Sequence, residues 1–192
     1  MSLRRSSGVN LPNMLTVLRI ILTPLFVILI INRMFVEAVI VFGLAAVSDG
    51  LDGFLARALK QKTTLGSYLD PIADKLLLSS AYVTLAVLHS IPSWLTVLVI
   101  SRDVIILVGA TMLHLMHGPI PIPIRPLPIS KLTTFFQLGT LLAVLLAPLY
   151  GFGQHRMMTA LFLATGALTV VSGLRYMFIG VKFLTAREAQ RR

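Results

Sequence analysis

The chain has no cysteine, and this absence removes whole classes of chemistry. Without thiols there is no disulfide framework, no nucleophilic cysteine and no thiolate ligand for a metal. The absence leaves the cellular compartment undecided. Charge is scarce as well, because only 12% of the 192 residues are charged while 56% are hydrophobic. A chain this apolar is not an ordinary water-soluble domain, so we predict a membrane protein.

Apolar segments nearly fill the chain. A transmembrane helix needs about 20 mostly apolar residues, and we expect such helices at residues 14–31, 35–58, 66–88, 93–116, 132–150 and 157–179. The first of them is longer than a signal-peptide core and has no small-residue cleavage pattern after it, so we expect it to be retained. With no internal repeat or second domain evident, we predict one membrane domain over residues 1–192, an all-α integral membrane protein built as a bundle of six transmembrane helices.

Basic residues are in excess, with 17 Lys and Arg against 7 Asp and Glu. In a membrane protein such residues first report topology, and we infer no nucleic-acid partner from them. They gather before the first predicted helix, at the second-to-third and fourth-to-fifth connections, and at the C-terminus. The positive-inside rule therefore places both termini and these two connections in the cytoplasm.

Acidic residues are few, yet five of the seven are aspartates inside predicted apolar helices. A carboxylate at mid-bilayer costs about 2.5 to 3.5 kcal/mol, so four unpaired ones would disfavour the fold by on the order of 10 kcal/mol. Asp49 and Asp52 are three residues apart, and Asp70 and Asp74 are four apart. Each pair therefore occupies one face of its helix.

The connection between these two helices is short, so we expect antiparallel neighbours whose aspartate pairs meet at similar depth. Two facing carboxylate pairs are hard oxygen ligands suited to Mg²⁺ or Mn²⁺, and four carboxylates can hold two such ions. No histidine belongs to the set, which argues against zinc. We predict a site for two divalent cations formed by Asp49, Asp52, Asp70 and Asp74.

Small residues and one arginine follow the first aspartate pair. Gly53 and Ala56 let a ligand approach the backbone, and Arg57 lies one helical turn beyond Gly53, where a guanidinium can hold phosphate. The alternatives are close helix packing for Gly53 and Ala56 and an interface anchor for Arg57.

Together these positions read Asp49-x2-Asp52-Gly53-x2-Ala56-Arg57-x8-Gly66-x3-Asp70-x3-Asp74. The pattern resembles the signature of the CDP-alcohol phosphatidyltransferases at all eight specified positions. The stretch Pro12-Asn13-x2-Thr16-x2-Arg19 also looks like the opening of family members that make phosphatidylglycerophosphate or cardiolipin. The resemblance implies a metal-dependent transferase of phospholipid biosynthesis that uses CDP-diacylglycerol and releases CMP.

The resemblance also implies residue roles. Asp49, Asp52 and Asp70 would bind metal, while Asp74 would contribute to the metal site and act as general base. The cytidine diphosphate site would use small residues, one arginine and two polar residues of the first helix: Gly53, Ala56, Arg57, Asn13 and Thr16. The resemblance further implies a homodimer. With the charge pattern, we expect a protein of a bacterial inner membrane whose active site faces the cytoplasm.

Polar residues in the fourth and fifth helices are candidates for the acceptor site: Arg102, Asp103, Lys131, Thr133, Thr134 and Gln137. Arg102 and Asp103 can instead form a structural pair, and Lys131 can be an interface anchor. Lys75, beside Asp74, is either a counter-charge or a phosphate contact.

The stretches around Arg102 and Lys131 resemble those of the mitochondrial-type, CMP-forming cardiolipin synthases. Phosphatidylglycerophosphate synthases look similar overall but usually carry Arg-Glu where this chain has Arg102-Asp103. We therefore favour phosphatidylglycerol as the lipid acceptor, with glycerol 3-phosphate as the alternative.

Two other classes remain open. Membrane prenyltransferases also bind pyrophosphate through Mg²⁺ and helical aspartates, but they usually need a larger bundle and two well-separated aspartate motifs. In a cation carrier, buried acids would line an ion path. That class does not require Gly53, Ala56 or Arg57.

Overall fold

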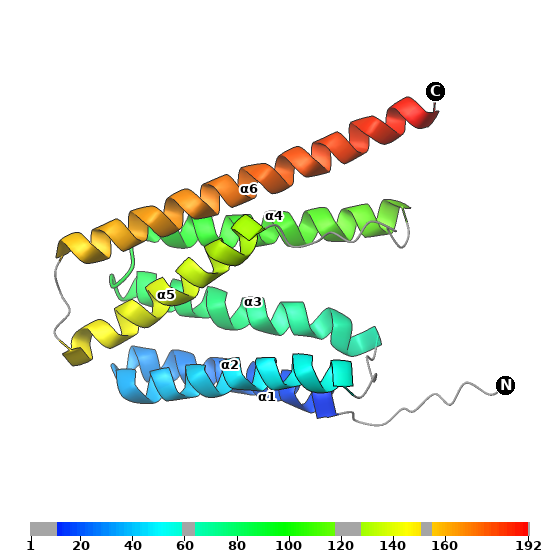
Figure 1. Cartoon of the computed structure of the whole chain (residues 1–192). Coiled ribbons are helices and arrows are strands. Elements are labelled where there is room, and N and C mark those ends of the chain that lie inside the picture. Colours follow the sequence, from blue (N-terminus) through cyan, green and yellow to red (C-terminus); the bar gives the residue numbers. More distant parts are fainter. Residues whose placement is uncertain (1–10, 59–63, 118–127, 151–154, 192) are drawn as a thin grey trace. The chain divides into compact units, whose positions relative to one another are not determined.

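The computed structural model describes the backbone of residues 11–58, 64–117, 128–150 and 155–191, and the side chains of residues 18–48, 75–109, 111, 128–149 and 156–180. Over these ranges the chain is helical apart from short turns, and it contains no strand. The helices are α1 (Leu11–Ile31), α2 (Phe35–Ala58), α3 (Thr64–Val87), α4 (Ser93–His117), α5 (Pro128–Tyr150) and α6 (His155–Arg191) (Figure 1). The all-α prediction is confirmed, and each described helix overlaps an expected one.

Two helices differ from their expected bounds by four residues or more. α5 begins at Pro128, four residues before residue 132, because proline is tolerated in the first turn of a helix. α6 runs for 37 residues to Arg191, well past residue 179. Its last turns contain Ala, Arg, Glu and Gln, which are strong helix formers although they are not all apolar.

The chain forms two compact units, Met1–Thr84 and Leu85–Arg192. In the first unit α1 packs against α2, and the rings of Phe26 and Phe42 lie 5.6 Å apart in its core. In the second unit α6 packs against both α4 and α5. A single domain over the whole chain stays a prediction.

Two helices end in the same kind of turn, although neither has glycine there. After α1, Arg33 has φ 60°, and the Met34 N–H donates to the Leu29 carbonyl at 2.9 Å. After α3, His89 has φ 56°, and the Ser90 N–H donates to the Leu85 carbonyl at 2.8 Å. These are Schellman turns, whose left-handed position glycine usually occupies.

Replacing Arg33 with Gly is expected to raise the free energy of unfolding by about 0.5 to 1 kcal/mol. A non-glycine residue in the left-handed region carries a steric cost that glycine avoids. Thermal melts in detergent, followed by far-UV circular dichroism, measure the change. Arg33→Ala is the control, since it removes the charge but keeps Cβ and should give no gain. A Gly variant that melts below the Ala variant contradicts the prediction.

Large apolar side chains face outward in both units. Ile21 and Val47 are 61% and 60% exposed, and Phe135 and Phe178 are each 71% exposed. Arg19 and Gln137, in contrast, are 1% and 0% exposed. A water-soluble surface rarely carries so many large apolar groups.

Two described segments are long and apolar enough to cross a membrane, Pro128–Leu149 and Arg156–Gly180. The other apolar stretches found in the described part of the chain are shorter: Leu18–Ile31, Phe35–Ser48 and Lys75–Val87. Six membrane crossings therefore stay a prediction.

Candidate active site

The aspartate motif lies on two consecutive helices. α2 is helical through Ala58 and carries Asp49 and Asp52, while α3 carries Asp70 and Asp74. With 3.6 residues per turn, the members of each pair share a helix face. The structure does not describe the side chains of these four aspartates or the surroundings of Gly53, Ala56 and Arg57. That the two pairs face one another stays a prediction.

The chemistry of this donor set fits hard divalent cations. Four carboxylates supply oxygen ligands only, which suits Mg²⁺ or Mn²⁺ better than metals that prefer nitrogen or sulfur. Among the residues whose side chains are described, no other group of three or more His, Asp or Glu side chains is placed to bind a metal. The motif thus remains the candidate for a metal site.

The packing of α1 against α2 determines which residues of the two helices lie at the same level along the helix axes. A turn of three residues joins them, so they are antiparallel neighbours, and Figure 1 shows them side by side. Positions equally far from Arg33 then lie at about the same level, because each residue advances about 1.5 Å along a helix. Thr16 is therefore level with Gly50, and Asn13 with Gly53. This backbone register brings both first-helix candidates to the level of the motif.

Arg19 lies in the interior of the same unit, since it is 1% exposed. The hydroxyl of Thr23 donates to the Arg19 carbonyl at 2.9 Å, one turn along α1. By the register above, Arg19 is level with Val47, just before the first aspartate pair. A guanidinium is stable in such a place only beside polar or anionic groups. Another cation of this unit, Lys75, is half-buried and directly follows Asp74.

A second polar centre joins α4, α5 and α6 at Arg102. One guanidinium nitrogen, Nη1, donates to Asp103 Oδ1 at 2.8 Å. The other, Nη2, donates to the hydroxyls of Ser130 at 2.6 Å and Ser172 at 3.0 Å. The guanidinium also lies 5.9 Å from the Tyr176 ring centroid, within cation–π range. We call this group the Arg102 centre.

The Arg102 centre continues into a row of polar side chains between α5 and α6, which we call the polar seam. Its residues recur at i, i+4, i+7 on each helix: Thr133, Gln137 and Thr140 on α5, and Thr165, Thr169 and Ser172 on α6. Gln137 Nε2 donates to Thr169 Oγ1 at 3.4 Å. The Thr140 and Thr165 hydroxyls are 2.7 Å apart. Hydroxyl and amide side chains of this kind hold helices together where the surroundings are apolar.

These contacts bear on the acceptor candidates. Arg102 forms the ion pair with Asp103 that sequence reasoning weighed as the alternative, and Thr133 and Gln137 belong to the polar seam. Lys131 is exposed, so its ammonium is accessible. Arg102 Nε is buried and makes no hydrogen bond within the described part of the chain. An unmade bond of this kind costs about 1 to 3 kcal/mol, so this N–H is suited to a ligand oxygen.

Sequence reasoning did not find Ser172 or Tyr176 of the Arg102 centre. A signal existed for Ser172, because Thr165, Thr169 and Ser172 recur at helical spacing in an apolar segment. Tyr176 gives no such signal, since its contact depends on how α6 packs against α4.

This chain carries the aspartate motif on two consecutive helices. It belongs to the CDP-alcohol phosphatidyltransferase family, whose model matches residues 9–180. The chain is 37% identical over 189 residues to the cardiolipin synthase (CMP-forming) of Homo sapiens, covering 90% of this chain and 62% of that protein. It is 34% identical over 181 residues to a probable phosphatidylglycerophosphate synthase of Mycobacterium tuberculosis (strain ATCC 25618 / H37Rv), covering 90% and 82%.

A third relative is the CDP-diacylglycerol--glycerol-3-phosphate 3-phosphatidyltransferase of Pseudomonas fluorescens. It is 43% identical over 103 residues, which cover 50% of this chain and 52% of that protein. The chain spans only 62% of the length of the human cardiolipin synthase. The match of the family model over residues 9–180 shows membership in the family. The identity of the acceptor is a separate question.

Proposed function

We propose that this protein transfers the phosphatidyl group of CDP-diacylglycerol to a hydroxyl of phosphatidylglycerol, making cardiolipin and releasing CMP. The acceptor oxygen forms a bond to the phosphatidyl phosphorus, the bond from that phosphorus to CMP breaks, and the acceptor proton passes to Asp74. The observation that carries the proposal is the complete aspartate motif on α2 and α3 of a family member.

Asp49, Asp52, Asp70 and Asp74 would hold two divalent cations, Mg²⁺ or Mn²⁺. When bound, such ions neutralise charge on the pyrophosphate and make CMP a better leaving group. Asp74 would receive the acceptor proton as general base. The all-carboxylate donor set supports the choice of Mg²⁺ or Mn²⁺.

The cytidine diphosphate group would lie along the backbone at the small residues Gly53 and Ala56, with Arg57 donating to a phosphate oxygen. The α1–α2 register supports a contribution from Asn13 and Thr16. Cations near the motif, Arg19 and Lys75, would offset the charge of the carboxylates and the pyrophosphate.

The acceptor phosphate would bind near Lys131 and the free N–H of Arg102. Phosphatidylglycerol is favoured by the Arg102-Asp103 pair and by the similarity to the human protein. Glycerol 3-phosphate is the second candidate, because the two bacterial relatives are named for phosphatidylglycerophosphate synthesis or for transfer to glycerol 3-phosphate.

We further propose that all six helices cross a bacterial inner membrane, with the motif toward the cytoplasm, and that the protein is a homodimer. α1 has 21 residues and α4 has 25. At about 1.5 Å per residue, helices of this length span the roughly 30 Å hydrocarbon core. The outward-facing apolar side chains support the same proposal.

The purified protein in detergent tests the reaction. It is incubated with CDP-diacylglycerol and Mg²⁺ or Mn²⁺, with phosphatidylglycerol and glycerol 3-phosphate added separately, while CMP and lipid products are followed. Cardiolipin formation supports the proposal, and phosphatidylglycerophosphate alone selects the second candidate. No CMP with either acceptor contradicts both.

Metal removal is expected to bring CMP release down to background, because without the cations the anionic carboxylates would repel the anionic pyrophosphate. The enzyme is dialysed against EDTA and assayed before and after addition of Mg²⁺, Mn²⁺ or Zn²⁺. Recovery with Mg²⁺ or Mn²⁺ but not Zn²⁺ matches a site made of oxygen ligands. Full activity in EDTA contradicts metal dependence.

A further inference from the structure

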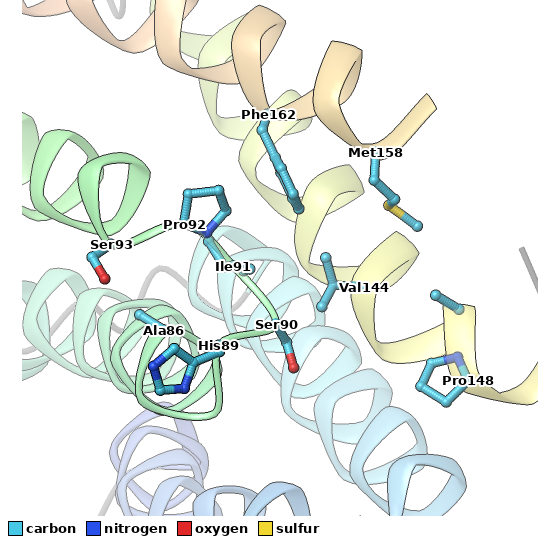
Figure 2. A pocket seen from close by; sticks show the side chains of 11 residues that line it. Ala86, His89, Ser90, Ile91, Pro92, Ser93, Val144, Pro148, Met158 and Phe162 are labelled. Atoms are coloured by element: carbon cyan, nitrogen blue, oxygen red, sulfur yellow. The ribbon is translucent and has the colours of Figure 1, made fainter. Parts of the chain in front are cut away.

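The second unit contains a pocket of about 500 Å³ at the turn between α3 and α4. Figure 2 shows its two kinds of lining. The side formed by the end of α3, the turn and the start of α4 carries three polar residues, His89, Ser90 and Ser93, among the apolar Ala86, Ile91 and Pro92. Apolar side chains from the end of α5 and the start of α6 lie on the other: Val144, Pro148 and Phe162. A ligand that fits both sides has a polar part and a hydrocarbon part.

The walls of this pocket are fixed by the fold. Val144 and Phe162 are only 6% and 9% exposed, so their side chains are held by the packing of α5 and α6. On the polar side, the Schellman turn at His89 is closed by backbone hydrogen bonds. Ile91 anchors the turn, because it is 2% exposed and its N–H donates to the Leu85 carbonyl at 3.2 Å. The pocket is thus largely preformed, as ligand sites usually are.

The chain around the pocket carries exposed apolar side chains. Val87 precedes the turn and is 70% exposed, and Met157 precedes the pocket segment of α6 and is 65% exposed. Trp94 follows Ser93 and is 44% exposed, and tryptophan favours the boundary between lipid headgroups and hydrocarbon. A polar turn next to an apolar surface is expected at the depth in the membrane where lipid headgroups meet the acyl chains.

We propose that this pocket binds a membrane phospholipid, with part of one acyl chain against Val144 and Phe162 and the headgroup region beside His89 and Ser90. The inference rests on the membrane placement under the proposed function. The volume lies within the roughly 300 to 1,000 Å³ range of small-molecule sites, so it holds part of a lipid while the rest stays in the bilayer. None of the residues that line the pocket belongs to the aspartate motif, since the first lining residue along the chain is Ala86.

Photocrosslinking tests the acyl-chain half. The protein in phosphatidylcholine vesicles is exposed to phosphatidylcholine with a photoreactive group in one acyl chain, and labelled peptides are mapped by mass spectrometry. Labelling is expected to concentrate on the peptides around Met158 and Pro148. Ala147→Phe, which fills the pocket, should reduce that labelling several-fold. Ala167→Phe is the matched control, because Ala167 is exposed on α6 outside the pocket.

The outcomes separate this site from the proposed reaction. Even labelling along all apolar helix faces, or no change in Ala147→Phe, overturns the pocket site. If Ala147→Phe does not give a monodisperse helical protein, Ala147→Leu makes the same test with a smaller side chain. Pocket labelling that responds to Ala147 in a protein that releases no CMP would leave the lipid site standing and reject the reaction. A protein that releases CMP but shows no pocket labelling that responds to Ala147 would reject the lipid site alone.

The polar half has its own variant. His89→Gly deletes the imidazole without straining the turn, since His89 already has φ 56°. Labelling by the phospholipid is expected to fall at least twofold, while labelling by a photoreactive fatty acid, which lacks that headgroup, stays unchanged. Arg33→Gly, the same change in the corresponding turn of the first unit, serves as control. Equal loss with both probes, or labelling by the fatty acid only, contradicts the phospholipid proposal.

Discussion

Replacing Asp74 with Asn is expected to lower CMP release by at least about 100-fold. A positioned general base contributes about 10²- to 10⁴-fold to rate, and an amide of the same size cannot accept the acceptor proton. The backbone of α3 is helical on both sides of Asp74, so the substitution should leave the fold intact. Initial rates of CMP release with saturating donor and acceptor give the measurement. A variant that keeps a tenth or more of the activity contradicts the base assignment.

Two further variants show whether Asp74 acts as base or only as metal ligand. Asp52→Asn removes a proposed metal ligand that is not proposed to accept a proton. Excess Mn²⁺ should therefore restore part of the activity of Asp52→Asn but none of the activity of Asp74→Asn. Glu37→Gln is the charge-matched control, since Glu37 is an exposed acid in the first turn of α2 and lies outside the motif. Equal rescue of both aspartate variants by Mn²⁺ points to metal binding alone.

Most helix positions are predictable from the sequence, because most apolar runs have a local cause for their end. The second helix was expected at residues 35–58, and α2 is Phe35–Ala58. The turn that precedes it contains Asn32 and Arg33, polar residues that interrupt the apolar sequence. The end of α6 was not predictable by the same reasoning, because hydropathy falls near residue 180 while helix propensity does not.

The two halves of the candidate site differ in how far the sequence predicts them. The aspartate motif is local, since its pairs are three and four residues apart, and helical bounds suffice to put each pair on one face. Apart from its ion pair with Asp103, the hydrogen bonds of Arg102 are not local: Ser130 and Ser172 are 28 and 70 residues away. Nothing in the residues around Arg102 identifies such partners, because they depend on the packing of three helices.

Replacing Arg102 with Met is expected to destabilise the second unit by about 3 to 5 kcal/mol. The change removes the bonds to Ser130 and Ser172 and leaves the Asp103 carboxylate, 6% exposed, without that guanidinium. Breaking a buried ion pair from one side costs about this much. The single tryptophan, Trp94 of α4, reports the loss, because its ring lies against Gly166 of α6. Thermal melts followed by Trp94 fluorescence measure it.

The double variant Arg102→Met/Asp103→Asn distinguishes a structural role from acceptor binding. Removing both charges avoids leaving the buried Asp103 carboxylate without the guanidinium, so the double variant should recover more than half of the lost stability. If the Arg102 centre mainly joins α4, α5 and α6, this recovery brings back CMP release with an unchanged KM for phosphatidylglycerol. If Arg102 Nε instead binds the acceptor phosphate, stability returns while that KM stays raised. A single variant that melts like the wild type contradicts the structural role and leaves acceptor binding to explain the conformation of Arg102.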